Sequence, residues 1–122
     1  MTKKRILLVD DESSFTSILK LVLKGFDVAV QNNPFLALET AKEFKPDIIF
    51  LDVIMPDLDG GAVAAQLRDD PDLCKIPIVF LTAIVSGTET ADKQTIGGYS
   101  FLAKPVSRDQ IIACVAKHLG VD

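Results

Sequence analysis

Five short apolar segments alternate with amphipathic stretches along these 122 residues, and this alternation restricts the fold more than any other feature. Runs rich in Ile, Val, Leu and Phe are typical of strands that helices cover on both faces of a parallel sheet. Strands that alternate with helices are typical of βα units. The strand segments are 5–9, 26–30, 47–51, 76–81 and 98–103. The sequence therefore predicts an α/β fold built from five βα units.

Helix signals fill the intervals between these strands. A helix is expected near 12–24 and should end at Gly25, with one apolar stripe formed by Phe15, Ile18, Leu19, Val22 and Leu23. Further helices are expected to begin at Asn33-Pro34, to run over 60–68 and 88–96, and to extend from Ser107 to Gly120. Asn33 is a favourable N-cap, and Ser107 with Gln110 forms a capping box.

Length, net charge and cysteine content limit the classes of function that this chain can have. The length is that of one domain, so we expect a single unit over 1–122 with no output domain. A net charge of −4 without a basic face argues against a nucleic-acid partner. No segment approaches the roughly 18 apolar residues of a membrane span. Cys74 and Cys114 lack metal-ligand spacing, and a reduced pair indicates a cytoplasmic protein.

Chemically distinctive side chains follow the predicted strands. Asp10 and Asp11 come after the first strand, Asp52 after the third, Thr82 after the fourth and Lys104 after the fifth. The carboxyl ends of parallel strands share one edge of a sheet, and ligands bind there where the strand order reverses. We therefore expect three carboxylates, a hydroxyl and an ammonium group to meet at that edge.

Such a cluster suits a divalent cation and a phosphoryl group. Two carboxylates about 4 Å apart repel by roughly 4 kcal/mol at an effective dielectric constant near 20. A hard cation such as Mg²⁺ relieves that repulsion and takes oxygen ligands. A carboxylate nucleophile with a metal, a hydroxyl and an ammonium group can form an aspartyl-phosphate. In the alternative interpretation, Asp10 and Asp11 only cap the first helix.

The order of these residues resembles the receiver domain of two-component response regulators. The segment LDVIMPDLDG (51–60) is similar to the phosphoacceptor loop of that family. The resemblance covers essentially the whole chain and implies a doubly wound, flavodoxin-like sheet of order 2-1-3-4-5. It also implies that Asp52 is the phosphoacceptor, and that Asp10, Asp11, Asp52 and the backbone carbonyl of Ile54 bind Mg²⁺.

Further roles follow from the same resemblance. Thr82 and Lys104 would contact the phosphoryl oxygens, Thr82 and Phe101 would form the switch, and Pro105 would follow a cis peptide bond. The phosphoryl donor would be a histidine kinase or a histidine phosphotransfer protein. A downstream protein would bind the fourth helix, fifth strand and fifth helix. Such a protein is not an enzyme in the ordinary sense, because it catalyses only its own phosphorylation and slow autodephosphorylation.

Three other interpretations remain. A haloacid-dehalogenase-type phosphatase has a similar nucleophile, but it needs an acidic residue two positions later, where this chain has Ile54. A flavodoxin-like FMN protein has a similar sheet, but Asp10-Asp11-Glu12 would repel the FMN phosphate. A degenerate receiver would bind partners without phosphorylation, although all five chemical positions are intact here.

Overall fold

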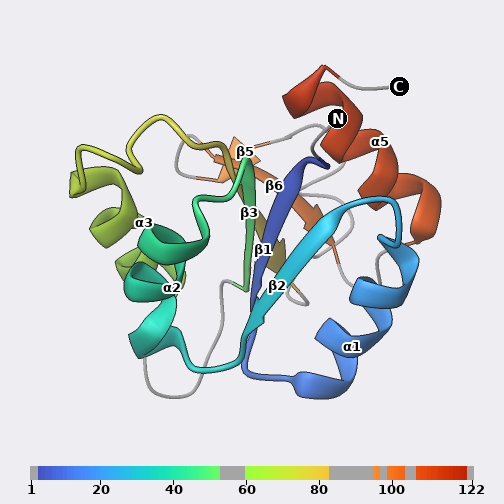
Figure 1. Cartoon of the computed structure of the whole chain (residues 1–122), viewed down its shortest axis with the longest axis horizontal. Helices are drawn as coiled ribbons and strands as arrows, with labels where there is room; N and C mark the ends of the chain where they lie inside the picture. Colours follow the sequence, from blue (N-terminus) through green and yellow to red (C-terminus); the bar gives the residue numbers. More distant parts are fainter. Residues whose placement is uncertain (1–2, 53–59, 83–94, 97–98, 104–106, 121–122) are drawn as a thin grey trace.

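The computed structural model describes residues 3–52, 60–82, 95–96, 99–103 and 107–120. In these residues one sheet runs through the molecule, with α1 and α5 on one face and α2 and α3 on the other (Figure 1). The elements are β1 (Arg5–Val9), α1 (Ser13–Val22), β2 (Asp27–Gln31), the 3-10 turn η1 (Pro34–Leu36), α2 (Ala37–Phe44), β3 (Ile48–Asp52), α3 (Gly60–Asp69), β4 (Ile78–Thr82), β5 (Thr95–Ile96), β6 (Tyr99–Ala103) and α5 (Arg108–Leu119).

The order of the strands is β2-β1-β3-β4-β6-β5. The neighbouring pairs from β2 to β6 are all parallel, and β6 takes the place expected for the fifth strand. The predicted doubly wound order 2-1-3-4-5 is therefore confirmed. The chain reverses direction across the sheet beside β1, and this places the carboxyl ends of β1 and β3 next to each other.

One element differs from the sequence prediction. Thr95 and Ile96 form β5, which pairs antiparallel with Ser100 and Tyr99 at the edge of the sheet. The predicted helix over 88–96 is wrong at these two positions, and its remaining residues lie outside the described part of the chain. Thr and Ile are β-branched and favour strands, and in the sequence a Gly-Gly pair separates them from the next apolar run.

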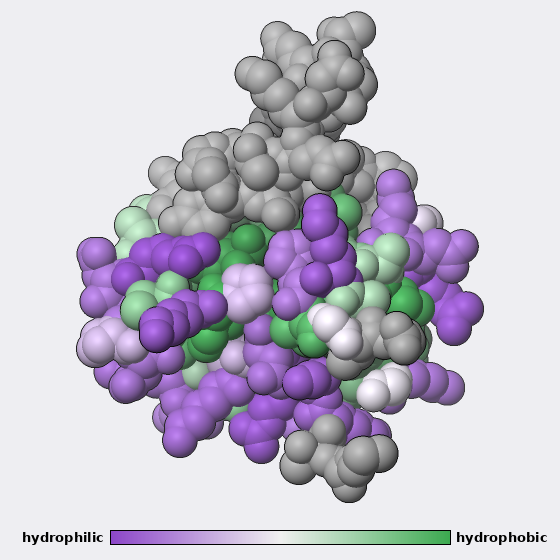
Figure 2. Space-filling view, turned by 90° about the horizontal axis from the view of Figure 1, so that it is seen from above, coloured by the Kyte–Doolittle hydropathy of each residue, from purple (hydrophilic) through white to green (hydrophobic). Residues whose placement is uncertain are grey.

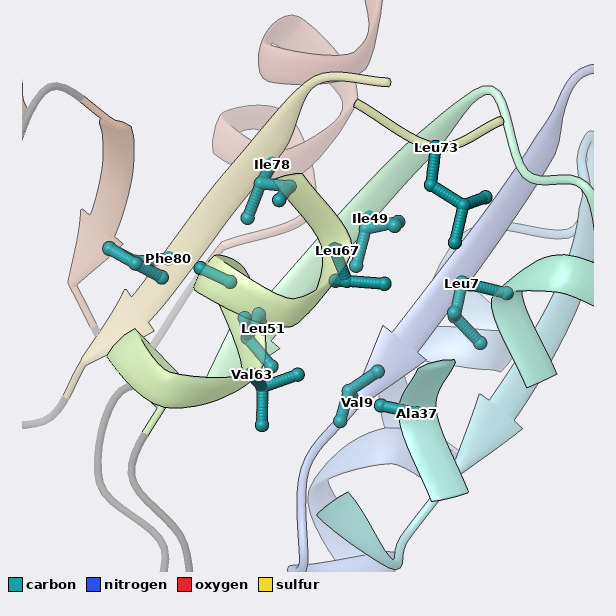
Figure 3. Close-up of a cluster of buried hydrophobic side chains, with 12 residues drawn as sticks. Leu7, Val9, Ala37, Ile49, Leu51, Val63, Leu67, Leu73, Ile78 and Phe80 are labelled. Carbon is teal, nitrogen blue, oxygen red and sulfur yellow. The ribbon is translucent and has the colours of Figure 1, made fainter. Parts of the chain in front are cut away.

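The core forms two layers, one on each face of the sheet. Side chains alternate along each strand, so Leu7 and Val9 face α2 and α3 whereas Ile6 and Leu8 face α1 and α5. Figure 3 shows the first layer, in which Val63 and Leu67 of α3 lie over the strands. All residues of β3 are buried, as expected for a central strand of a parallel sheet.

Helix α1 differs in detail from the expected amphipathic stripe. Leu19 and Leu23 are buried, but Ile18 is 61% exposed, so its assignment to the buried stripe is wrong. Thr16, a polar residue, is buried on that side instead. The helix ends earlier than expected, with Leu23 as its C-cap. Gly25 is not the left-handed C′ residue, because among the described glycines only Gly120 has a positive φ.

The other expected caps are present. Asn33 accepts a hydrogen bond from the N–H of Phe35, and Pro34 begins η1. Ser107 and Gln110 form the reciprocal capping box at the start of α5. Gly120 ends α5 with a φ of 67°, a left-handed conformation that glycine adopts without strain. These caps fix where the chain enters η1 and where α5 begins and ends.

The described surface is largely hydrophilic on the face that Figure 2 shows, where hydrophobic residues occupy smaller areas between charged and polar ones. Across the described residues, no helix has both the length and the apolar character needed to cross a bilayer. Cys74 and Cys114 are free thiols, as the sequence predicted.

Candidate functional site

Asp10 is the first residue after β1, and the sheet holds its backbone in place. Its N–H donates to the carbonyl of Gln31 (3.2 Å), which extends the pairing with β2 by one bond. Its side chain is buried, and Oδ1 accepts from the N–H of Glu12 (2.9 Å) at the start of α1. Asp10 therefore does satisfy an N–H at the helix start, as the capping interpretation requires. That bond does not exclude a second role for the carboxylate.

Asp52 is the last residue of β3 and is only 5% exposed. Its backbone lies opposite Leu81 of β4, and the preceding Leu51 lies opposite Val9 of β1. Its strand neighbours thus place Asp52 between the ends of β1 and β4. Asp11, in contrast, is exposed beside this edge.

The structure brings these three aspartates together. Carboxylate oxygens of Asp10, Asp11 and Asp52 all lie within 4.8 Å of one another, and among the described residues no other group of three or more His, Cys, Asp and Glu side chains meets this condition. At 4.8 Å and an effective dielectric constant near 20, each pair of charges repels by about 3.5 kcal/mol. Two of these carboxylates are buried, so solvent screens them weakly. This acidic cluster can bind a metal ion.

The remaining predicted site residues divide into two groups. Thr82 is the last residue of β4 and lies opposite Ala103, so its backbone is at the edge of the sheet that carries the acidic cluster. Phe101 lies on the neighbouring strand β6, opposite Phe80, before the end of that strand. Ile54, Lys104 and Pro105 lie outside the described residues. Their expected roles remain predictions.

Two residues near the cluster were missed by sequence reasoning. Asn32 donates from Nδ2 to the backbone carbonyl of Asp10 (2.6 Å) and to Oγ1 of Thr16 (3.1 Å). Asn32 follows β2, where a polar residue looks like an ordinary loop residue. Thr16 looks like an ordinary polar residue on a helix. Nothing in the spacing of either residue points to the carboxyl end of β1.

Comparison with known proteins identifies the family. The model of the response regulator receiver domain matches residues 6–116. This chain belongs to that family. As a receiver domain it is a signalling module of two-component systems, and the match covers nearly the whole chain, including all three aspartates.

Individual relatives agree with this assignment. The receiver domain is 34% identical over 119 residues to the DNA-binding response regulator MtrA of Mycolicibacterium paratuberculosis, a match that covers 96% of this chain and 52% of the relative. MtrA of Mycolicibacterium smegmatis is also 34% identical, with 96% and 51% covered. The chain thus spans about half the length of these curated relatives.

Solved structures show the same fold. The signal receiver domain of a signal transduction histidine kinase from Syntrophus aciditrophicus superposes with a TM-score of 0.80 at 28% identity, covering 96% of this chain and 90% of that one. A response regulator from Desulfuromonas acetoxidans gives a TM-score of 0.78 at 28% identity, covering 96% and 97%.

Proposed function

We propose that this receiver domain accepts one phosphoryl group on Asp52 in a step that requires Mg²⁺. The donor is a phosphohistidine of a histidine kinase or of a histidine phosphotransfer protein. The observation that carries the proposal is the convergence of Asp10, Asp11 and Asp52 at the end of the sheet, with carboxylate oxygens within 4.8 Å of one another. A fold gains no stability from gathering like charges, so the arrangement favours a role in binding.

The ligand atoms favour Mg²⁺ over softer metals. Asp10, Asp11 and Asp52 offer only oxygen, and Mg²⁺ binds through one or two carboxylates together with water and phosphoryl oxygens. The carbonyl of Ile54 is the proposed backbone ligand. When bound, the cation would neutralise part of the negative charge of the carboxylates and of the phosphoryl oxygens.

The protein takes part in only one covalent step of the transfer. A carboxylate oxygen of Asp52 forms an O–P bond while the P–N bond of the donor breaks, and the imidazole nitrogen keeps the electron pair and takes up a proton. Thr82 and Lys104 are the proposed contacts of the phosphoryl oxygens. Positioning and charge neutralisation supply the rate enhancement. The protein turns over no separate substrate, and beyond this step it catalyses only slow loss of its own phosphoryl group.

The proposed output is a change of binding surface. Thr82 and Phe101 lie on adjacent parallel strands, β4 and β6, and Leu102 of β6 packs against the core layer that contains residues of α5. A shift at the carboxyl end of β4 can therefore reach the surface of β6 and α5. We infer that a downstream protein binds there and to the segment expected as the fourth helix. The net charge of −4 supports a protein partner rather than nucleic acid for this part of the chain. We also propose that the protein meets its kinase in the cytoplasm.

Locating the modified residue tests the proposal. The chain is incubated with acetyl phosphate and Mg²⁺, the acyl phosphate is reduced with borohydride, and the digested peptides are sequenced by mass spectrometry. We expect reduction products only at Asp52, in the peptide that contains β3. Asp47, an aspartate at the opposite end of β3, provides the control position: Asp47→Asn should be phosphorylated like the wild type, and Asp52→Asn should not. Equal uptake by Asp52→Asn would refute the assignment.

A further inference from the structure

The side chain of Asn32 completes the hydrogen bonding of the backbone at Asp10. In a parallel sheet, a residue donates its backbone N–H to a carbonyl of the neighbouring strand, and its carbonyl accepts from an N–H two residues further along that neighbouring strand. Asp10 donates to the carbonyl of Gln31, but its own carbonyl accepts from Nδ2 of Asn32 at 2.6 Å. The backbone N–H of Asn33 donates elsewhere, to Oε1 of Gln31 (2.9 Å). A side-chain amide thus takes the place of a backbone donor.

The second proton of the same amide joins this contact to α1. Nδ2 of Asn32 also donates to Oγ1 of Thr16 (3.1 Å), and this hydroxyl in turn donates to the carbonyl of Ser13 (3.0 Å). Thr16 is buried, so its hydroxyl needs these partners. The chain of bonds therefore runs from the carbonyl of Asp10 through Asn32 and Thr16 to the first turn of α1.

These bonds surround the turn that carries two of the three carboxylates. The peptide between Asp10 and Asp11 has its carbonyl fixed by Asn32, and the Asp10 carboxylate is fixed by the N–H of Glu12. Rotation of that peptide would move the side chains of Asp10 and Asp11 relative to Asp52. Hydrogen bonds that orient a ligand commonly change metal affinity when they are removed, even though they do not touch the metal.

We propose that Asn32 and Thr16 are positioning residues that hold the Asp10–Asp11 turn in the geometry that binds the divalent cation. The inference rests on the proposed Mg²⁺ site. It predicts that loss of the Asn32 amide weakens cation binding without abolishing phosphoryl transfer once the cation is saturating, because the three carboxylates themselves remain.

Mg²⁺ titrations of matched variants, followed by amide NMR, test the proposal. Asn32→Ala removes the amide, Thr16→Val removes the hydroxyl at constant shape, and Thr16→Ser retains the hydroxyl. Asn33→Ala is the control, because Asn33 neighbours Asn32 and caps η1 through the N–H of Phe35 (3.0 Å) but makes no bond to Asp10 in the described structure. The rate of phosphorylation by acetyl phosphate at saturating Mg²⁺ is measured for each variant.

We expect half-saturating Mg²⁺ to rise roughly tenfold in Asn32→Ala and about threefold in Thr16→Val, with Thr16→Ser near the wild type. The rate at saturating Mg²⁺ should stay within about twofold of the wild type, as expected when binding rather than chemistry is impaired. Asn33→Ala should lower the melting temperature and leave the Mg²⁺ titration unchanged.

Wild-type Mg²⁺ binding in both Asn32→Ala and Thr16→Val would overturn the positioning role. An equal weakening in Asn33→Ala would also overturn it, because general loosening of the segment after β2 would then explain the effect. Absence of saturable Mg²⁺ binding in the wild-type protein is a distinct result: it would refute the metal site itself, and the inference with it.

Discussion

A carboxylate oxygen of Asp10, the residue that follows β1, lies within 4.8 Å of a carboxylate oxygen of Asp52, the last residue of β3, and both residues are buried. Close burial of two like charges opposes folding, because neither charge is well solvated and the two repel. The adjacent positions of β1 and β3 in the sheet enforce this proximity. At this distance the two carboxylates repel each other, and a bound cation would reduce that repulsion.

Magnesium is therefore expected to stabilise the folded protein. A ligand that binds only the native state stabilises it by RT ln(1 + [L]/Kd), which is about 1.4 kcal/mol at ten times Kd. We expect the melting temperature of the wild type to rise by several degrees as Mg²⁺ is added. Differential scanning calorimetry with Mg²⁺, with K⁺ at matched ionic strength as the control, measures this shift. An identical curve in both salts would contradict the prediction.

Removal of one carboxylate should affect Mg²⁺ binding and the stability of the folded protein in opposite ways. Asp11 is exposed, so Asp11→Asn removes a charge from the cluster without leaving a cavity. We expect this variant to be at least as stable as the wild type in EDTA, because repulsion falls, and to gain little stability from Mg²⁺. Urea unfolding in EDTA and in Mg²⁺ measures both quantities. A large loss of stability in EDTA would show that Asp11 has a structural role instead.

The response to phosphorylation should extend beyond the acidic cluster. Phe80 pairs with Phe101 and Thr82 with Ala103, so β4 and β6 are linked along most of their length. A population shift needs differential contacts in the two states, and these strands can carry one. Beryllofluoride with Mg²⁺ mimics the acyl phosphate, and we expect it to shift amide resonances over residues 84–115. Shifts confined to the surroundings of Asp10, Asp52 and Thr82 would contradict this prediction.

Substitutions in the core should lower the free energy of unfolding more than substitutions on the surface. Phe50 is fully buried in β3 within the layer formed with α1 and α5, so Phe50→Ala should reduce the free energy of unfolding by about 3–5 kcal/mol. Ile18 is 61% exposed, and Ile18→Ser should change that free energy by no more than about 0.5 kcal/mol. Urea denaturation of both variants tests the two values. A cost above about 2 kcal/mol for Ile18→Ser would contradict its exposed position.

Cys114 should react slowly with alkylating reagents in the folded protein. Burial raises the pKa of this thiol to about 11 from 9.0, with Lys117 acting weakly in the opposite sense. A pKa that is two units higher leaves about a hundredfold less thiolate at neutral pH. We expect iodoacetamide to modify Cys114 about a hundredfold more slowly in native Cys74→Ser protein than in urea. Equal rates would contradict the prediction.

The same shift has a consequence for stability. Because the pKa of Cys114 is higher in the folded state, its contribution to stability is fully present below pH 9 and is lost as the pH rises towards 11. Cys114→Ala should therefore lose less stability than the wild type between these two pH values. Urea midpoints measured at pH 9 and at about pH 11 give this difference.

Most of the fold could be predicted because its signals are local and strong. Continuous apolar runs predicted the parallel strands within about two residues, and Asp10 and Asp52 stand directly at strand ends. The rule that parallel strands share a carboxyl edge then brings the carboxylates together. The capping box of Ser107 and Gln110 likewise predicted the start of α5 from a local pattern.

The remaining features depend on tertiary contacts that sequence patterns do not contain. Ile18 fits an apolar stripe, but the helix turns Leu19 and Leu23 toward the sheet and leaves Ile18 outside. Thr95 and Ile96 pair with β6, although the sequence pattern over 88–96 predicted a short helix. Asn32 reaches Asp10 because β2 lies beside β1, and no spacing rule links an asparagine after one strand to a carbonyl after another.

The most direct test of the acidic cluster is phosphoryl uptake with and without the cation. Wild-type protein is incubated with acetyl phosphate in Mg²⁺ or in EDTA, with Asp52→Asn in parallel, and its intact mass is measured. We expect the wild type to gain one phosphoryl group in Mg²⁺ and none in EDTA, and Asp52→Asn to gain none in either buffer. Full uptake by the wild type in EDTA would contradict the proposal that Asp10, Asp11 and Asp52 act through a bound cation.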